Sequence, residues 1–199
     1  MRSQEDVEFV KLLGTSKGFG IAAADPQRWA ALTVWRAHPR PIDAFDRIAT
    51  ARVRLTLRPT ATRGRWAGRE PFTVETGEST QSNGPVLVLT RARLRPTRAI
   101  TFWRAIRPVA ATLSDAKGLL TAFGIGEAPI GFQGTVSIWA GGRQVNAFAY
   151  RTAEHAEVVG KAPARRWYAE ELFARLEVLE VTGEREVIGW NAGLSPGRA

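Results

Sequence analysis

The 199-residue chain contains no cysteine and only two histidines, His38 and His155. The lack of cysteine excludes disulfides, thiolate nucleophiles, iron–sulfur clusters and cysteine-ligated zinc. With two histidines, a metal centre built from several imidazoles is nearly excluded as well. Each histidine therefore has to be judged by its own surroundings in the sequence.

The chain also lacks long apolar runs. None approaches the roughly 18 residues of a membrane-spanning helix, and the first residues, MRSQEDVEF, are too acidic and too poor in apolar side chains for a secretory signal. Hydrophobic residues make up 44% of the chain and charged residues 24%, which is typical of globular proteins. We expect a cytoplasmic protein that forms one buried domain, or two small halves that share a core.

Lysine is scarce: only four of the 28 basic residues are lysines, and the net charge is +9. The arginines are spread along the chain, and no zinc-finger spacing, RNP sequence or basic zipper accompanies them. We therefore expect no nucleic-acid partner. A peripheral contact with an anionic membrane surface is the other partnership that such a charge can serve.

Apolar patterning and turn residues divide the chain into predicted elements. Strands are predicted at 9–15, 28–35, 85–95, 119–133 and 135–140, and residues 62–75 are strand-like with glycine turns. Helices are predicted at 41–53, 95–106 and 144–160, and residues 166–181 are predicted to run from a short helix into a final strand. Residues 76–85 have the composition of a linker, and we expect residues 191–199 to fray.

The predicted elements favour an α+β fold built from two related halves. The order in residues 84–182 is β-α-β-β-α-β, a ferredoxin-like unit. Residues 1–80 repeat part of it, since Trp35 and Trp139 close corresponding strands. We expect two ferredoxin-like halves packed sheet to sheet, an α+β barrel in one chain. The first half is expected to lack its first strand and helix, so that another element covers the exposed edge or the true start lies upstream. Residues 183–199 form a tail.

His155 lies on the apolar side of the helix predicted at 144–160. The stripe that contains it recurs at three- and four-residue steps and consists of Val145, Phe148, Thr152, His155 and Val159. One interpretation is a core histidine that is hydrogen-bonded to a backbone carbonyl. The other is an axial ligand, because heme iron needs only one protein ligand. The stripe alone leaves both interpretations open.

Arg91, Arg93 and Arg95 alternate along the strand predicted at 85–95, so they share a face with Leu87 and Leu89. One interpretation is a strand that runs from the core to solvent and carries arginines at its wet end. The other places Arg91, the deepest of the three, beside a bound oxygen or substrate. The pattern favours neither interpretation over the other.

Other motifs carry weaker signals. GTSKGFG (14–20) lacks the P-loop spacing, and GIGE (124–127) lacks the third glycine and following helix of a dinucleotide site. Glycines within a strand, such as Gly126, do allow a flat cofactor to approach the sheet closely. His38 lies between a predicted strand and helix and is assigned no role. No serine has the surroundings of a nucleophile.

Six short motifs then occur in a recognisable order: FVKLLGT, VLTRARLRP followed by FW, GIGEAP, TVSIW, HAEVV and WYAEELFARLEVL. From Phe9 to Leu179 the chain resembles the spheroidene monooxygenase family in these motifs. The resemblance implies a heme enzyme that adds a keto group near the end of a carotenoid polyene. It also implies a relationship to dimeric α+β barrel proteins. HAEVV matches the helix histidine of the family, so the resemblance implies His155 as the proximal iron ligand.

The chain departs from the family pattern in two places. Relatives usually have another strand and helix before the FVKLLGT-like segment. A strand that reads KIGIGE in relatives reads AFGIGE here, with Ala122 in the place of a lysine. Any role of that lysine has no counterpart in this chain, and we expect the substrate to have diverged accordingly.

The leading hypothesis is a heme-dependent monooxygenase that acts on an apolar, carotenoid-like substrate and takes electrons from an external donor. His155 holds the iron and Arg91 is the distal polar group, while the expected cofactor contacts are Phe148, Arg151, Thr152, Val159 and Gly126. A homodimer is a further expectation. The alternatives are a heme-dependent dehydratase or rearrangement enzyme, which needs no reductant, and a non-catalytic heme- or ligand-binding barrel.

Overall fold

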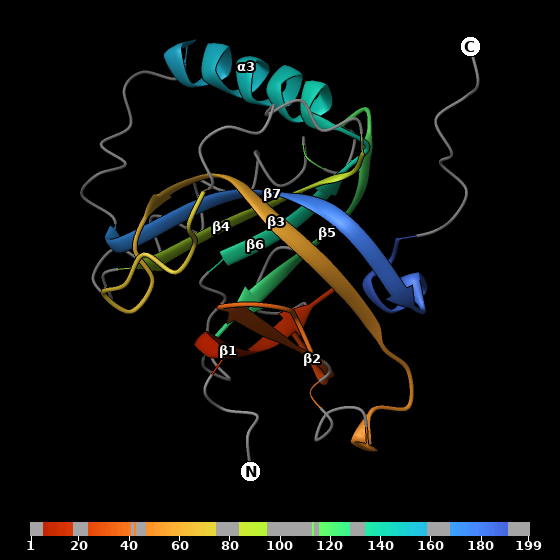
Figure 1. Ribbon diagram of the computed structural model, residues 1–199. Helices are drawn as coiled ribbons and strands as arrows, with labels where there is room; N and C mark the ends of the chain where they lie inside the picture. Colours follow the sequence, from red (N-terminus) through yellow and green to blue (C-terminus); the bar gives the residue numbers. More distant parts are fainter. Residues whose placement is uncertain are drawn as a thin grey trace.

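The computed structural model of the protein describes residues 6–17, 24–40, 42, 47–74, 84–94, 113, 116–127, 134–158 and 168–190. For residues 94, 151–158 and 168 the description covers the backbone. Within this part of the chain, seven strands form one antiparallel sheet and a single long helix lies outside it (Figure 1). The fold is of the α+β class, as the sequence predicts.

The strands of the sheet are, in chain order, β1 (Val7–Ser16), β2 (Ala24–Trp35), β3 (Val53–Gly64), β4 (Val86–Leu94), β5 (Leu119–Gly126), β6 (Gly134–Trp139) and β7 (Tyr168–Gly183). Their order across the sheet is β2-β1-β5-β6-β4-β7-β3. The helix α3 (Gly142–Val158) connects β6 towards β7, and the short 3-10 helix η4 (Arg185–Ile188) follows β7. Neighbouring strands in the middle of the sheet, such as β4 and β7, are therefore far apart in the sequence.

Two predicted helices differ from the structure where it describes them. Of the helix predicted at 41–53, described residues 47 and 48 are helical, and β3 begins at Val53. Pro59 obscured this strand in the sequence, but β3 is an edge strand with a register shift between Pro59 and Ala61, where proline is tolerated. The short helix predicted at the start of 166–181 is also absent, because β7 is one continuous strand between β4 and β3.

Other predicted elements agree with the structure or lie outside it. The strands predicted at 9–15, 28–35, 85–95 and 135–140 and the helix at 144–160 are present within a few residues, while the strand predicted at 119–133 ends at Gly126. The helix predicted at 95–106, most of the linker at 76–85 and residues 191–199 lie outside the described residues.

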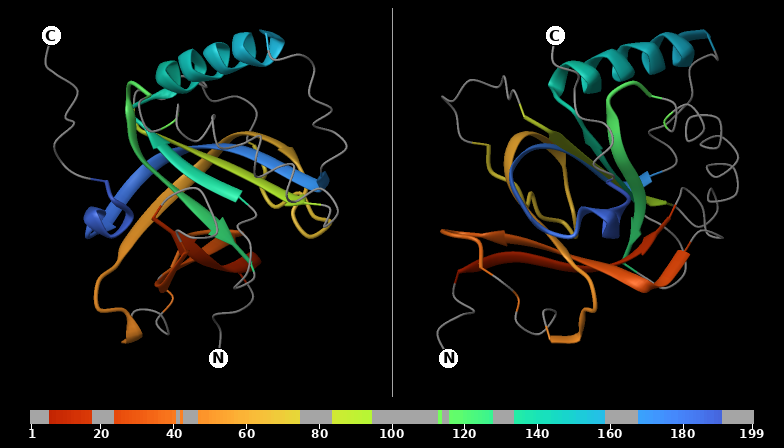
Figure 2. Two further views of the ribbon diagram at one scale, coloured as in Figure 1. Left: turned by 180° about the vertical axis from the view of Figure 1, so that it is seen from behind. Right: turned by 90° about the vertical axis from the view of Figure 1, so that its right-hand side faces the viewer.

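The sheet is strongly curved around its inner face, and α3 lies on its outer face (Figures 1 and 2). Side chains from all seven strands meet on the inner face in one apolar cluster, which includes Leu89, Ile125 and Leu172 and also the fully buried Trp66. A smaller cluster on the outer face joins Val145 of α3 to the sheet. Alternate residues of each central strand therefore serve two different cores.

The two halves predicted from the sequence are joined unequally. Along one junction, β3 and β7 pair from Val53 opposite Gly183 to Gly64 opposite Leu172. At the other, β1 and β5 pair only through Gly14 opposite Gly126 and Thr15 opposite Ile125. We call this second junction the seam. On either side of the seam only β1 or only β5 continues, so there are no further backbone pairs between them. Contacts between side chains therefore have to join the two halves there.

Candidate functional site

A buried charged cluster lies on the inner face of the sheet, at the end of β4. The Arg91 side chain is 4% exposed, and its guanidinium contacts the carboxylates of Glu127, at 3.0 Å, and Glu170. The guanidinium also lies 5.5 Å from the centre of the Trp66 ring. Arg93 is exposed, so Arg91 is the more deeply buried of the two, as the alternation predicts.

Glu127 connects the two halves of the chain at this point. It follows β5 directly, and its second oxygen accepts a 2.6 Å ion pair from Lys11 of β1. The Lys11 ammonium also lies 5.6 Å from the Phe9 ring and 6.0 Å from the Trp66 ring. One carboxylate therefore bridges a cation of the first half and Arg91 of the second half, close to the seam that backbone pairing scarcely closes.

Glu170 holds the segment that follows β3. Trp66 and Arg69 pair with each other, with N···O distances of 2.8 and 3.2 Å, around a two-residue turn. The two central residues have positive φ, 54° at Ala67 and 73° at Gly68, as a type I′ turn requires. Both of their N–H groups donate to the Glu170 carboxylate, at 3.0 and 2.7 Å. These bonds offset the strain at Ala67 and fix Trp66 in the core.

The electrostatic environment keeps both carboxyl groups ionised. Burial raises the pKa of Glu127, but Lys11, the Trp66 indole and Arg91 outweigh it and hold this pKa below the ordinary 4.5. Burial acts on Glu170 in the same way. The turn N–H groups and Arg91 outweigh it and lower the pKa of that carboxyl too. Both glutamates therefore stabilise the fold in their charged form.

We expect this cluster to make the free energy of unfolding depend on pH in the acidic range. Because the folded-state pKa of each glutamate is lowered, its contribution is complete above the ordinary value of 4.5 and is lost as the pH falls through the lowered values. The variant with Glu127→Gln and Glu170→Gln should be less stable than the parent at neutral pH, and the difference should shrink as the pH falls below 4.5 through the lowered pKa values. Urea unfolding at a series of pH values measures it. A constant difference would contradict this assignment.

The outer face of the sheet presents mostly small side chains beside α3. Two cross-strand rows lie there, Val88–Ser137–Ala122 and Thr90–Thr135–Gly124. The first half of α3 packs beside them through Val145, and Phe148 lies 5.2 Å from Trp139 at an angle of 43°. From there α3 runs back antiparallel to β6 (Figure 1). Position 155 lies about 10 Å further along the helix axis than Phe148, in line with the same stripe.

The predicted site residues fall on two faces of the sheet. Arg91 faces the inner core, and Gly126 ends β5 at the seam, opposite Gly14. Phe148 lies on α3 beside the outer face. Arg151, Thr152 and His155 belong to α3, but their side chains, like the whole of Val159, lie outside the described residues. The structure therefore does not bring Arg91 to the face that α3 covers.

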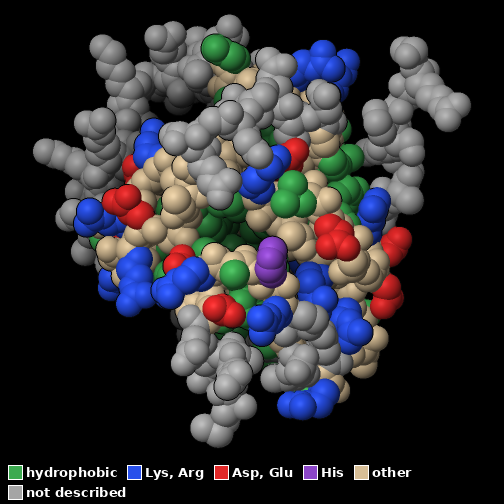
Figure 3. All heavy atoms as spheres, in the orientation of Figure 1, with side chains coloured by type: hydrophobic (Ala, Val, Ile, Leu, Met, Phe, Trp, Pro, Cys, Tyr) green, Lys and Arg blue, Asp and Glu red, His purple; other side chains and the backbone are tan. Residues whose placement is uncertain are grey.

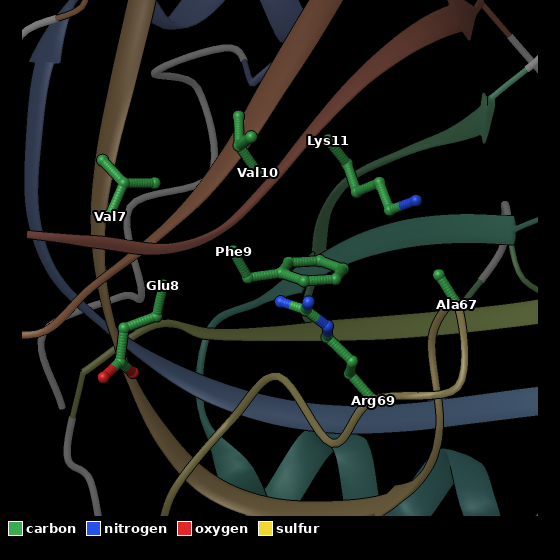
Figure 4. A pocket seen from close by; sticks show the side chains of 7 residues that line it. All are labelled: Val7, Glu8, Phe9, Val10, Lys11, Ala67 and Arg69. Atoms are coloured by element: carbon green, nitrogen blue, oxygen red, sulfur yellow. The ribbon is translucent and has the colours of Figure 1, made fainter. Parts of the chain in front are cut away.

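Two cavities lie beside β1 and β5, away from the paired residues of the seam. The smaller, about 280 Å³, lies between β1 and the turn that holds Ala67 and Arg69 (Figure 4). The larger, about 690 Å³, follows the first five residues of β5 and borders η4. In its wall Arg28 donates to the carbonyls of Ser16, at 2.6 Å, and Val187, at 2.8 Å. Figure 3 shows a hollow in the front face of the molecule, with hydrophobic side chains at its floor and charged side chains around it.

Neither a multi-ligand metal site nor a membrane-spanning helix is found in the described part of the chain. No three histidine, aspartate or glutamate side chains gather there. Among the same residues, no helix combines the length and the apolar character needed to cross a bilayer. A cofactor with a single protein ligand does not depend on such a cluster.

Comparison with known proteins places the chain in a family. It is 31% identical over 193 residues to a spheroidene monooxygenase of Rhodobacter capsulatus, an alignment that covers 92% of this chain and 80% of that protein. The chain belongs to the spheroidene monooxygenase family. Two further members, from Cereibacter sphaeroides and Rubrivivax gelatinosus, are 29% and 30% identical, and the chain spans 58% and 70% of their lengths. No protein-family model and no solved structure matches the chain.

Sequence reasoning found Arg91 but missed its partners. Lys11, Trp66, Glu127 and Glu170 lie on four different elements, so no spacing in the sequence connects them. One signal was available: an arginine in line with two buried leucines needs carboxylate partners. Glu127 lies in the middle of the strand predicted at 119–133 and Glu170 in the short helix predicted at the start of 166–181, so the predicted elements did not single out either residue as that partner.

Proposed function

We propose that the chain is a monooxygenase that binds heme and acts on an apolar, carotenoid-like substrate, with His155 as the proximal iron ligand. The observation that carries the proposal is family membership over 92% of the chain, since the relatives are named spheroidene monooxygenase. The position of His155 on α3, in line with residues that face the sheet, supports the role of that residue.

The proposal includes the fold of each half. In the second half the sheet order β5-β6-β4-β7, with α3 between β6 and β7 in sequence, supports a ferredoxin-like unit. In the first half β1, β2 and β3 extend the same curved sheet from both sides. We propose that the two halves together form an α+β barrel of the dimeric type within one chain.

The residues around α3 fit a flat, apolar cofactor. On the outer face, Thr90, Thr135 and Gly124 form a row of small residues across β4, β6 and β5, which Phe173 borders on β7, whereas Trp139 packs against Phe148 in the first half of α3. A heme bound there would be held by His155, with Phe148, Thr152 and Val159 along the same side of the helix. Arg151 would pair with a propionate, and Gly126 would allow close approach to β5.

The heme and the protein supply different parts of the chemistry. When bound, the heme supplies the iron at which dioxygen is activated. The chain orients the substrate and excludes water, for which the apolar surroundings of Trp139, Val86 and Val88 are suited. The sequence has neither a flavin nor a nicotinamide motif, so electrons come from a separate donor. Ala122 lies in the row of small outer-face residues, opposite Ser137.

The histidine assignment is tested by titrating the purified protein with hemin and recording the absorption spectrum. We expect a Soret band that saturates at one heme per chain, and we expect His155→Ala to weaken binding about tenfold or more, or to shift the band. The matched control is His38→Ala, because His38 is the other histidine and is exposed after β2. Identical spectra for His155→Ala and the parent would refute the assignment.

A further inference from the structure

An apolar surface lies on the outer face of the β1–β2 hairpin, at the opposite end of the sheet order from β3. Three of the large hydrophobic side chains that the structure leaves exposed gather there: Val10 at 52%, Leu12 at 55% and Trp29 at 50%. The strand register makes them neighbours, since Leu12 lies opposite Ala31 and Gly14 lies opposite Trp29. We call this surface, together with Ala31, the hairpin face.

The rest of the sheet shows that this exposure is unusual for the molecule. On the outer face of β4 and β6, Val86, Val88 and Trp139 are 3%, 9% and 2% exposed, because they lie in the cluster that α3 completes. The other large exposed hydrophobic residues, Ile48, Tyr150 and Leu179, lie on separate elements. A contiguous apolar surface of this kind marks an interaction site more often than scattered single residues do.

We propose that the hairpin face docks on the surface of a lipid bilayer that contains anionic lipids. This inference rests on the proposed function, because a carotenoid-like substrate dissolves in a bilayer and not in water. Tryptophan and aliphatic side chains on one face, with a polar opposite side, are the features of an interfacial contact. A bilayer is also large and flat enough to cover both strands at once.

The overall charge of the chain suits an anionic surface. The chain carries a net charge of +9, and exposed cations lie at both ends of the hairpin: Lys17, with 80% of its side chain exposed, and Arg36, with 71%. Each of these cations has an acidic neighbour, Asp25 at 3.6 Å and Glu8 at 3.2 Å, so the charge at the two ends of the hairpin is balanced and the long-range attraction to anionic lipids comes from the net charge of the whole chain. Long cationic side chains at the border of an apolar face can reach lipid phosphates while their stems stay in contact with it.

Vesicle sedimentation of the whole chain, without heme or substrate, tests the proposal. We expect binding to vesicles of phosphatidylcholine mixed with phosphatidylglycerol, weaker binding to phosphatidylcholine alone, and weaker binding to both at high salt. The variant with Leu12→Thr and Trp29→Thr should partition roughly tenfold to a hundredfold less, because each apolar side chain removed from water contributes about one order of magnitude. Threonine keeps the strand propensity of both positions.

Leu179→Thr is the matched control, because Leu179 is 52% exposed on β7, away from the hairpin face. It should bind like the parent. A second pair keeps the test valid if the double variant does not fold: Ala31→Glu places a carboxylate on the hairpin face, and Ala61→Glu places one on the exposed side of β3. Only Ala31→Glu should weaken binding to the mixed vesicles.

Two results would overturn the proposal. One is a parent that does not sediment with the mixed vesicles, or hairpin variants that bind as well as the parent. The other is a parent that is a dimer by analytical ultracentrifugation and that becomes monomeric in the double variant, which would show that a second copy covers the hairpin face. Vesicle binding needs no heme, so its failure leaves the hemin titration unaffected, and failure of that titration leaves this result standing.

Discussion

Replacing Arg91 with methionine is expected to lower the free energy of unfolding by about 3–5 kcal/mol. The Arg91 side chain is 4% exposed and is the cation shared by Glu127 and Glu170. Methionine has a similar volume, so little packing is lost, but both carboxylates lose a charged partner close to the core. The cost comes from losing a charge-assisted hydrogen bond at each carboxylate, since Glu127 then keeps Lys11 as its charged partner and Glu170 keeps the two N–H groups of the turn.

The measurement is urea or guanidinium unfolding of Arg91→Met and of Arg93→Met. Arg93 lies two residues further along β4 and is exposed, so its replacement should change the free energy of unfolding by only about 0.5 kcal/mol. A triple variant with Arg91→Met, Glu127→Gln and Glu170→Gln should recover part of the loss, because it also removes the two carboxylate charges that Arg91 no longer balances. Equal effects at positions 91 and 93 would contradict the cluster described above.

A further variant, Arg91→Lys, separates two roles of Arg91. As a member of the cluster, it lies on the inner face of the sheet, while the proposed heme lies beside α3 on the outer face. The role of Arg91 as a distal polar group stays a prediction. Arg91→Lys keeps the positive charge. If Arg91 is the distal polar group, turnover should fall in this variant even when its free energy of unfolding equals that of the parent. A purely structural role requires turnover and stability to fall together.

The sequence correctly predicted those strands and helices whose conformation is determined by residues close to them in the chain. The alternation Leu87, Leu89, Arg91 gave β4 and its buried face correctly, and the stripe through Val145 and Phe148 gave the contact side of α3. Each pattern arises within a single strand or helix, one side of which packs against a large apolar surface. Such a pattern of apolar residues can be recognised without knowing the order of the strands in the sheet.

Elements that depend on distant partners could not be predicted in the same way. The start of β7, with Glu170 and Glu171, has good helix-forming residues, yet it pairs with β4, and from Leu172 onward β7 pairs with β3 as well. Tertiary pairing overrides local propensity there. The charged cluster has the same character, since Lys11 and Glu127 are more than a hundred residues apart and meet only because β1 and β5 adjoin at the seam.

The second large effect is expected at Trp66, whose replacement by alanine should lower the free energy of unfolding by about 3–5 kcal/mol. The side chain is fully buried in the inner cluster, where it meets the Phe9 ring edge to face at 5.7 Å. Its loss leaves a cavity between β1 and the end of β4 and removes the ring beside Arg91. Trp29→Ala is the control, because Trp29 is half exposed, and it should cost about 1 kcal/mol or less.

A double-mutant cycle shows whether Trp66 acts through the cluster or only by filling space. Because Trp66 and Arg91 are in contact, the variant with Trp66→Ala and Arg91→Met should depart from additivity by about 0.5–3 kcal/mol. Arg28 contacts Phe123 and the carbonyl of Val187 instead, so Trp66→Ala and Arg28→Met should add within about 0.5 kcal/mol. Additive behaviour in both pairs would mean that the indole contributes packing alone. Coupling confined to the first pair would mean that ring, guanidinium and carboxylates hold the seam as one unit, where β1 and β5 share only two paired positions.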